Sequence, residues 1–561
     1  MRSNSYIQIA KLLSIWTLVL LAGCAREEVE PLGEEGVYDE IYLNIRLDID
    51  NGGTESRANR PIEDGEITVD GTVNENVINS LQLFWKENGV WRMLNLGAAD
   101  LASIRNGKSI KIAFDKDDYP ALEQEGIKMW LGANLSTAQA EAFMTDNGVY
   151  RLTAATWAGE LAPMYSDFTG RSDIAMFCAE SGTTRLVANS QDDEYSISFR
   201  LKRLVAKVLV ACKADEDGYA NTPNTKNGLD GWIKRSEVQY TLNGVNKSTY
   251  IMQQVQDGTD YDANVTDPNQ NLQDYANLYD ADNETSYLTL INGDFYYYNV
   301  TNLMQNAGLY RDAAPVDENA NYTAGIYCPE NTFDAVQDAG NLSDNPSAWG
   351  MVTSVSIKAK FTPRRLNVEG GLFDYILSHN AADLTQSVKN AVQELKTDVE
   401  SRFTISENEA YGVVCPTEAV AKAFLKYSLV YNNFLTNEIQ ADNGFPDETY
   451  FYHSENNEYY TYGAAKINLG ATGNTTELGN YQPYYDGWGF YYTYIDNRLD
   501  SSKNGNFTFY RHGQVERNRY YILTVNSFSS PGSSVGDANY VEVNTNVLPW
   551  KNGGKGEITL E

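Results

Sequence analysis

The sequence predicts a mainly β protein in which antiparallel sheets carry a few helical insertions. Short runs of alternating apolar and polar residues, bounded by Gly, Asn, Asp and Ser, recur along most of the 561-residue chain. This period of two is typical of half-buried strands. Only two stretches, both in the second half, place apolar residues at helical spacing instead. No repeat of about 20–50 residues is evident, which argues against solenoids and propellers.

The charge balance excludes two classes of partner. The chain has 43 Lys and Arg against 76 Asp and Glu, a formal net charge of −33. Nucleic acid and anionic membrane surfaces are both bound through basic patches, so neither is predicted as a partner. Aromatic residues make up 12% of the chain, which is too many for a disordered protein.

The first 24 residues predict a lipoprotein signal. Arg2 and Lys11 precede and flank an apolar run, residues 12–21, which is too short to span a bilayer but typical of a secretory signal. The run ends in Leu21-Ala22-Gly23-Cys24, which resembles the lipobox of bacterial lipoproteins, and by that resemblance Cys24 is acylated. No later segment is apolar enough to cross a membrane, so the only membrane contact expected is through the lipid of the precursor.

Residues 41–49 form the first clear strand. Its apolar face consists of Ile41, Leu43, Ile45, Leu47 and Ile49. The segment 50–61 that follows is rich in Gly, Asn and Ser, which indicates an exposed, flexible loop. This loop contains Arg57 and Ala58.

Further elements are expected before residue 150. Asn88-Gly89 is typical of a type I′ turn and predicts a hairpin between strands that begin at Leu81 and Val90. Ser136 followed by Gln139 has the pattern of a capped short helix. The remaining strands are expected at 110–114 and 127–131.

An acidic linker, residues 191–194, predicts a domain boundary at 195/196. Helices are expected at 384–403 and 418–434. The stretches 255–285 and 441–485, rich in Asn, Asp, Tyr and Gly, are expected to be surface loops. Strands beyond the boundary are expected at 196–201, 204–210, 238–242, 287–291, 355–361, 491–495 and 520–528.

No motif predicts an enzyme. Residues 532–536 match G-x-S-x-G by letter, but Pro531 precedes them and no His follows. A nucleophile elbow needs a strand before it, a helix after it and a downstream His in the hydrolase order. Nothing singles out a carboxylate pair for glycoside hydrolysis. The three histidines, His379, His453 and His512, have no clustered partners.

No metal or cofactor is predicted either. Residues 260–264 supply the first three ligand positions of a Ca²⁺ loop, but Val265 stands where the turn Gly belongs, so a solvated acidic loop is expected. Besides Cys24, the cysteines have no metal-binding spacing. They allow zero, one or two disulfides, and isolated buried thiols are favoured, at Cys178, Cys212, Cys328 and Cys415.

The two ends of the chain form a matched pair of apolar-faced strands, because residues 541–547 alternate like 41–49. If the first strand were cut away after Arg57, it would leave a groove lined for about five side chains. At about 1.5–3 kcal/mol per buried aliphatic side chain, an empty groove would forfeit about 8–15 kcal/mol. The C-terminal strand of another subunit could recover this by strand addition.

Arg57 is the best-placed arginine for such a cut. Arg46 lies within the predicted strand, where the paired backbone cannot enter a protease cleft. Arg60 precedes Pro61, a poor bond for trypsin-like enzymes. The alternative is that 41–49 is a permanent first strand and Arg57 an ordinary surface residue.

Several motifs, in chain order, resemble the type V pilins, the fimbrial shaft subunits of the Bacteroidales, and are most like the minor-fimbrium shaft subunit family. The resemblance covers the chain from end to end. After the lipobox and the strand before Ser56-Arg57-Ala58, the motifs are Arg203-Leu204-Val205-Ala206-Lys207-Val208, Lys358-Ala359-Lys360-Phe361-Thr362-Pro363, Arg517-Asn518-Arg519-Tyr520-Tyr521 and Val547-Leu548-Pro549-Trp550-Lys551.

The resemblance implies two transthyretin-like antiparallel β-sandwich domains, with helical insertions in the second. It divides the chain into a signal peptide with lipobox (1–24), a propeptide with a placeholder strand (25–57), an N-terminal domain (58–195) and a C-terminal domain with a donor strand (196–561). It implies cleavage between Arg57 and Ala58 by an arginine-specific protease. The donor residues that it implies are Val541, Val543, Val547, Leu548 and Trp550.

The predicted function is therefore structural: a non-enzymatic pilin that polymerises with copies of itself in a surface fimbria and mediates adhesion or biofilm contacts. The resemblance implies fimbrial anchor and tip subunits and surface receptors as further partners, and a precursor anchored to the outer membrane. Two alternatives stay open. The 39 Tyr and 9 Trp suit a monomeric, surface-anchored glycan-binding lipoprotein. The chain could also be a tip or accessory subunit of the same pilus, and a lipid-anchored glycosidase is a more distant alternative.

Overall fold

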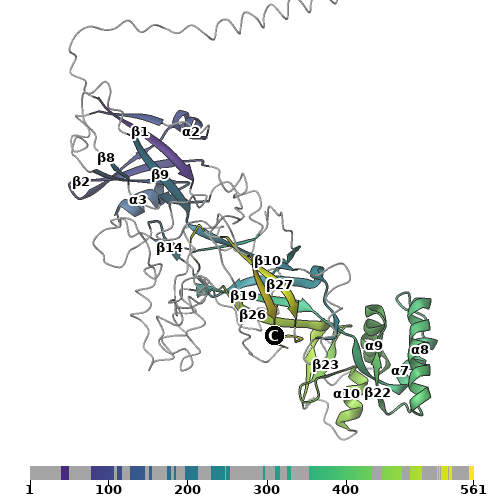
Figure 1. The fold of residues 1–561 in the computed structure, drawn as a ribbon. Coiled ribbons are helices and arrows are strands. Elements are labelled where there is room, and N and C mark those ends of the chain that lie inside the picture. The colour runs from purple at the N-terminus through teal and green to yellow at the C-terminus, as the bar shows by residue number, and fades with distance from the viewer. Residues whose placement is uncertain are drawn as a thin grey trace, which may run out of the picture.

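The computed structural model arranges the described part of the chain as an N-terminal β unit, a β sandwich and, at the far end, a module that holds most of the helices (Figure 1). The mainly β class with helical insertions in the second half is confirmed, and most strand pairs are antiparallel. The structure describes residues 40–49, 78–105, 110–115, 127–145, 151–153, 174–178, 182–184, 196–212, 229–246, 248–252, 295–296, 310–315, 325–329, 353–432, 445–470, 480–495, 515, 517–518, 520–528, 530–533 and 555–560.

The N-terminal unit is built on one sheet with the strand order β3-β2-β5-β7-β9-β1-β4, and β8 pairs with β5. Most of its neighbouring strands are antiparallel. The strands are β1 (Glu40–Ile49), β2 (Leu81–Glu87), β3 (Val90–Asn95), β4 (Ile110–Asp115), β5 (Ile127–Ala133), β7 (Met176–Cys178), β8 (Gly182–Thr184) and β9 (Ser196–Arg203).

This sheet folds back on itself. The rings of Trp85 on β2 and Phe114 on β4 have centroids 5.9 Å apart. The two strands are five positions apart in the strand order, and neighbouring strands are spaced about 4.8 Å apart, so a flat sheet would separate them by about 24 Å. The sheet therefore closes over a shared core in the manner of a sandwich.

Local sequence signals in this unit are confirmed. Asn88 and Gly89 both have positive φ, 51° and 81°, as a type I′ hairpin turn requires. Ser136 and Gln139 form a capping box, in which Ser136 N–H donates to Gln139 Oε1 at 2.8 Å and Gln139 N–H donates to Ser136 Oγ at 3.2 Å. The helix that follows, α3 (Thr137–Thr145), packs Phe143 against the core of the sheet. A second short helix, α2 (Ala98–Arg105), was not predicted.

The N-terminal sheet extends past the boundary predicted at 195/196. β9 pairs with both β1 and β7, so residues 196–203 belong to this sheet. The acidic stretch at 191–194 precedes the last strand of the unit rather than ending the unit. At the end of β9, the buried Arg203 guanidinium donates to Asn518 Oδ1 at 3.0 Å, which ties the two halves of the chain together. We therefore propose Leu204 as the boundary.

The second unit is a sandwich of two sheets. One has the order β17-β10-β27-β28, with β18 beside β10, and the other has the order β16-β12-β19-β26. The hydroxyl of the buried Tyr240 on β12 lies 3.5 Å from the Val208 carbonyl oxygen on β10, across the interface between the sheets. The strands are β10 (Val205–Cys212), β12 (Val238–Asn243), β16 (Arg311–Asp312), β17 (Ala314–Pro315), β18 (Ile326–Pro329), β19 (Ser354–Lys360), β26 (Trp488–Tyr494), β27 (Tyr520–Phe528) and β28 (Lys555–Leu560).

Short strand pairs surround this sandwich. β6 pairs with β14, which links the N-terminal half of the chain to the second unit. A 3₁₀ turn, η4 (Arg235–Glu237), leads into β12. The short strands are β6 (Arg151–Thr153), β11 (Gly231–Trp232), β13 (Val245–Asn246), β14 (Ser248–Tyr250), β15 (Phe295–Tyr296) and β20 (Thr362–Pro363).

The described residues between 365 and 484 form an inserted module, because the chain leaves the sandwich after β19 and β20 and returns at β26, which is the neighbour of β19 in its sheet. Its own sheet has the order β22-β21-β24-β23-β25. The elements are β21 (Arg365–Glu369), α7 (Gly370–Ser378), α8 (Gln386–Arg402), β22 (Ala410–Val414), α9 (Glu418–Tyr431), β23 (Tyr450–His453), β24 (Glu458–Tyr460), α10 (Tyr462–Leu469) and β25 (Tyr481–Tyr484), followed by the 3₁₀ turn η9 (Tyr485–Gly487).

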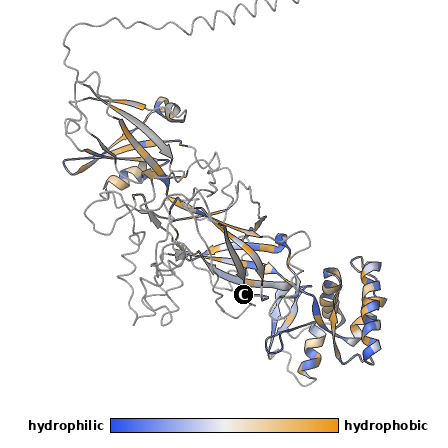
Figure 2. Ribbon diagram, viewed as in Figure 1, coloured by the Kyte–Doolittle hydropathy of each residue, from blue (hydrophilic) through white to orange (hydrophobic). Residues whose placement is uncertain are grey.

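Two predicted helices are confirmed here and one predicted loop is wrong. The helices expected at 384–403 and 418–434 are α8 and α9, and their hydrophobic and hydrophilic faces are visible in Figure 2. The stretch 441–485, expected as a surface loop, instead contains β23, β24, α10 and β25. Several of its tyrosines are core residues, since Tyr450, Tyr460 and Tyr462 are at most 3% exposed.

The cysteine expectation is confirmed for the four residues outside the signal: Cys178, Cys212, Cys328 and Cys415 are buried thiols, and none of them is in a disulfide. Burial raises the pKa of the Cys328 thiol, and it raises that of Cys415 to about 12. These thiols are therefore protonated core residues at neutral pH. Within the described ranges, no helix is both long and apolar enough to cross a membrane.

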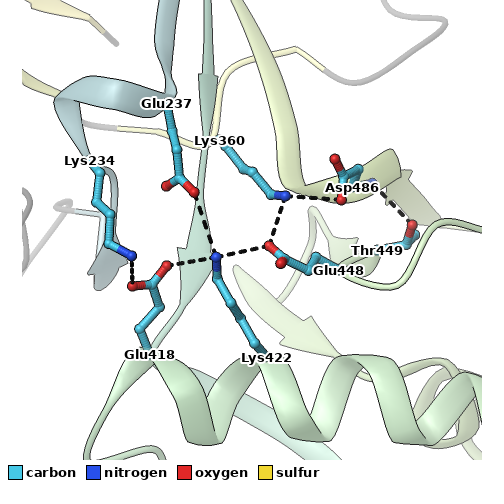
Figure 3. A network of polar contacts seen from close by, with 8 residues as sticks. All are labelled: Lys234, Glu237, Lys360, Glu418, Lys422, Glu448, Thr449 and Asp486. Carbon is cyan, nitrogen blue, oxygen red and sulfur yellow. Dashed lines mark hydrogen bonds and ion pairs between the residues drawn. The ribbon is translucent and has the colours of Figure 1, made fainter. Parts of the chain in front are cut away.

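An ion-pair network joins the module to the sandwich (Figure 3). Lys422 on α9 is at its centre, with Nζ 2.9 Å from Glu418, 3.1 Å from Glu448 and 3.6 Å from Glu237 of the sandwich. Lys360 at the end of β19 extends the network, since its Nζ lies 2.9 Å from Glu448 and 3.0 Å from Asp486. Oppositely charged groups from both bodies therefore fix how the module sits on the sandwich.

Lys422→Met is expected to lower the free energy of unfolding by about 1–3 kcal/mol near pH 7, between the values for exposed and buried ion pairs. Burial raises the pKa of Glu418, but hydrogen bonds from Lys234 and Lys422 outweigh it and hold this pKa below its ordinary value of 4.5. A carboxyl with a lowered folded-state pKa stabilises the protein above its unfolded pKa and loses this effect as the pH falls. The difference between wild type and variant in urea unfolding should therefore shrink from about pH 7 to about pH 3.

The matched control is Lys426→Met, one turn further along α9. Lys426 pairs with Asp383 and Asp447, which are 47% and 67% exposed. Exposed pairs contribute at most about 1 kcal/mol, so this variant should stay close to wild type. If Lys422→Met lowers the free energy of unfolding equally at about pH 7 and about pH 3, the role given to Glu418 is contradicted.

Candidate assembly site

The predicted placeholder strand is an interior strand of the N-terminal sheet. β1 pairs antiparallel with β4 on one side and parallel with β9 on the other. In the register with β4, Leu43 is opposite Ile112; in the register with β9, Leu47 is opposite Phe199. Both edges of β1 are therefore hydrogen-bonded to partner strands over most of its length.

The positions predicted for the apolar face of β1 match buried residues of both neighbours. Leu43 itself is 0% exposed. Residues opposite one another in a ladder project to the same face of the sheet, and residues two apart share a face. In the ladder with β4, Ile41, Leu43 and Ile45 stand opposite Phe114, Ile112 and Ile110, respectively. In the ladder with β9, Ile45, Leu47 and Ile49 stand opposite Ile197, Phe199 and Leu201. All six partner residues are at most 8% exposed.

Removal of β1 would open the sheet. Among the described strands, β1 is the only ladder partner of β4, and it separates β4 from β9 in the strand order. Without β1, the backbone groups that face it on β4 and β9 would lose their hydrogen bonds, and their buried apolar residues would border a groove. Unsatisfied backbone groups and exposed apolar surface both carry a cost in free energy, so such a groove favours the entry of another strand.

Leu43→Ala is expected to lower the free energy of unfolding of the uncleaved subunit by about 2–5 kcal/mol, because it creates a cavity at a fully buried position. If β1 is replaced during assembly, polymers made from this variant should dissociate at the wild-type temperature. Val90→Ala, at a residue 59% exposed on β3, is the control and should cost under about 0.5 kcal/mol. Urea unfolding of the precursor and heating of the polymer in SDS measure the two effects, and equally weakened polymers would show that β1 stays in place.

The other predicted assembly residues lie outside the described residues. These are Cys24, Arg57, Ala58, Val541, Val543, Val547, Leu548 and Trp550. The last described strand, β28, pairs in parallel with β27 at an edge of its sheet. The structure therefore places the first and last strands of the chain in different sheets and does not bring them together.

The residues weighed for chemistry form no centre in the described part of the chain. No group of three or more His, Cys, Asp or Glu in these ranges could hold a metal ion. The Ca²⁺-like stretch 260–264, His512 and Ser534, the serine of the G-x-S-x-G match, lie outside them. Ser533 belongs to an antiparallel bridge with Phe490. His379 stacks on Tyr375, and His453 packs on Tyr481.

The sequence pattern predicts the strand at 41–49 but not its neighbours in the sheet. The alternation of apolar and polar residues shows which face of 41–49 is apolar. An edge strand and an interior strand have the same alternation, so the pattern does not tell them apart. That β1 lies between an antiparallel and a parallel neighbour depends on β4 and β9, the second of which begins about 150 residues later in the chain.

Comparison with known proteins gives likeness only at the level of structure. No protein-family model matches the sequence, and no curated protein matches it. A fimbrilin from Porphyromonas gingivalis is 10% identical over 92% of this chain and 96% of its own, with a TM-score of 0.34. The tip fimbrial protein of the same species, with a C-terminal truncation, is 12% identical over 58% of this chain and 81% of its own, with a TM-score of 0.25. A fimbrial assembly protein from Parabacteroides distasonis is 15% identical over 38% of this chain and 67% of its own, with a TM-score of 0.21.

Proposed function

We propose that this chain is a structural subunit of a cell-surface fimbria that polymerises by donor-strand exchange. In this proposal it is exported as a lipoprotein acylated at Cys24 and cut between Arg57 and Ala58 by an arginine-specific protease. The observation that carries the proposal is the position of β1: an interior strand of a sheet whose other strands all follow Arg57 in the sequence.

Cleavage after Arg57 would make β1 a separable strand. The cut leaves β1 on one fragment and the other seven strands of the sheet on the other. Afterwards only hydrogen bonds with β4 and β9 and the packing of residues such as Leu43 would hold it. Another strand with alternating apolar residues can replace a strand that is held in this way.

The C-terminal segment of a second copy is the proposed replacement. Val541, Val543 and Val547 give it the same alternation as β1, and Leu548 and Trp550 extend the apolar set. Because the acceptor is in the N-terminal sheet and the donor is at the other end of the chain, each contact joins two different surfaces. Such a contact leaves one donor and one acceptor free, so the assembly grows as an open filament.

Fimbrial anchor and tip subunits would terminate this filament, and surface receptors would be its adhesion targets. The glycan-binding alternative is less well supported, since many aromatic residues of the module are occupied in its core. Tyr450 stacks on Tyr484 with ring centroids 4.8 Å apart, and Phe361 packs edge-on against Tyr450 and Tyr459. Buried rings of this kind cannot stack on a sugar.

Limited trypsin treatment of protein lacking residues 1–24 tests the proposal. Unboiled samples are run on SDS gels, and the new N-terminus is sequenced. A ladder of SDS-resistant oligomers whose subunits begin at Ala58 is expected. A monomer that stays intact at Arg57, or one that is cut there and stays monomeric, would exclude the proposed assembly.

A further inference from the structure

Residues 530–533 lie along the free edge of β26, and we call them the root segment. β26 is the last strand in the order β16-β12-β19-β26. Phe490 and Ser533 form an antiparallel bridge in which Phe490 N–H donates to the Ser533 carbonyl at 3.0 Å and Ser533 N–H donates to the Phe490 carbonyl at 2.8 Å. The chain leaves β27 in one sheet of the sandwich and is thus fastened to the edge of the other sheet.

Two buried tyrosine hydroxyls hold the root segment from different bodies. Tyr491 on β26 donates to the Ser530 carbonyl at 2.8 Å, and Tyr484 on β25 of the inserted module donates to the Gly532 carbonyl at 2.7 Å. Both tyrosines are 2% exposed. Burial raises the pKa of Tyr491 well above its ordinary value, so its hydroxyl keeps the proton that it donates.

The backbones meet too closely for side chains at two glycines. A Cβ on Gly489 of β26 would come within 1.8 Å of the Pro531 carbonyl oxygen. Gly532 has a φ of +76°, and a Cβ there would meet the Phe490 carbonyl oxygen at 2.9 Å. Pro531, whose carbonyl oxygen makes the first of these contacts, is buried. The root segment is therefore fixed in position by main-chain packing as well as by hydrogen bonds.

The root segment also has a defined direction. Its one bridge, between Phe490 and Ser533, is antiparallel, so at Ser533 the backbone runs opposite to β26, which begins at Trp488. Trp488 pairs with Lys360, whose ammonium contacts Glu448 and Asp486 beside the inserted module. The module lies at the opposite end of the molecule from the sheet that contains β1 (Figure 1). The bridge therefore fixes the direction of the backbone at Ser533, in the half of the chain that does not carry the acceptor sheet.

We propose that residues 530–533 are the fixed root of the donor segment, and that Tyr484 and Tyr491 are positioning residues that direct this segment toward a second copy of the chain. The inference rests on the proposed function. A root held at one place reduces the conformational freedom that the donor loses when it enters a groove, and such preorganisation favours association. Residues up to Ser533 would stay with their own subunit, and the residues beyond it would be exchanged.

The test separates the donor role from the acceptor role. A donor-only subunit carries Arg57→Ala and keeps its own β1, whereas an acceptor-only subunit is cut after Arg57 and lacks residues 541–561. Mixing the two permits one SDS-resistant heterodimer and no longer polymer, and the rate of its formation is measured on gels. The double variant Tyr484→Phe with Tyr491→Phe is placed first in the donor and then in the acceptor.

In the donor-only subunit, this double variant is expected to slow heterodimer formation by about 5- to 30-fold, the effect of two lost hydrogen bonds. In the acceptor-only subunit it should have no effect. Gly532→Ala should act in the same way on the donor side. Tyr452→Phe is the control, because that hydroxyl donates to Asn457 at 2.6 Å in the same module rather than to the root segment.

The outcomes distinguish the two proposals. If the wild-type pair forms no heterodimer, the proposed function fails and this inference fails with it. If the wild-type pair assembles and the double variant assembles equally fast as a donor, or is slowed equally in both roles, then the root segment has no positioning role while the proposed function stands. Thermal unfolding of each variant checks that the fold is retained.

Discussion

Arg57→Ala is expected to yield a subunit that keeps its first strand and does not polymerise. In the precursor β1 occupies the position between β4 and β9, so no second copy can enter it. An intact chain also holds β1 at a high effective concentration, and this favours its return over replacement by a donor. After limited trypsin treatment, unboiled gels should show a monomer where wild type shows a ladder, which corresponds to a loss of at least about 100-fold in polymer yield.

Two matched variants make this result specific. Arg60→Ala alters a nearby arginine before Pro61 and should polymerise like wild type. Arg57→Lys should resist an arginine-specific protease but assemble normally after trypsin, since trypsin also cuts after lysine. Normal fibres from Arg57→Ala would remove cleavage at this bond from the mechanism, and a defect in Arg57→Lys that trypsin does not reverse would do the same.

Elements that depend on local chemistry could be predicted from the sequence. The positive φ angles of Asn88 and Gly89 follow from the turn that their side chains permit. The capping box of α3 needs only residues three apart. α8 likewise follows from its apolar spacing and from Thr385, whose hydroxyl accepts from Val388 N–H at its start.

Composition was misleading where tyrosine forms the core. The stretch 441–485 contains many Asn, Asp, Gly and Tyr residues, which usually indicate loops. In the structure Phe451, Tyr460 and Tyr462 pack in one core cluster with Ala464 and Ala465 of α10, and the pairing of the short strands β23, β24 and β25 holds the first two in place. Strands of three or four residues are too short to show a period, so only long-range packing reveals them.

The assembly site could be predicted in part for the same reason. The apolar face of β1 is a local pattern, and the buried Leu43 agrees with it. The interior position of β1 and the extension of the sheet to Arg203 depend on ladders between distant segments, which no short window contains. The root segment had one local signal, the Pro531-Gly532 pair, but its hydrogen bonds to Tyr484 and Phe490 join residues 48 and 43 positions apart.

Deletion of residues 541–561 is expected to give a subunit that is cut after Arg57 but stays monomeric, because no donor strand is then present to replace β1. The cleaved monomer should retain its own fragment with β1, held by the ladders to β4 and β9. Size-exclusion chromatography followed by a denaturing gel should therefore show one monomeric peak that contains both fragments.

The deletion also removes β28, so a second variant is needed to assign the effect to the donor residues. Replacing Val541, Val543 and Val547 by Ser leaves the residues of β28 unchanged. It removes three aliphatic side chains worth about 1.5–3 kcal/mol each when buried, together about 5–9 kcal/mol of the attraction for the groove. Such a loss corresponds to more than about 1,000-fold in binding, since each 1.4 kcal/mol is tenfold. If the triple variant polymerises like wild type while the deletion does not, the donor is β28 rather than residues 541–550; if both polymerise, the groove is filled by another part of the chain and exchange of the C-terminal strand is excluded.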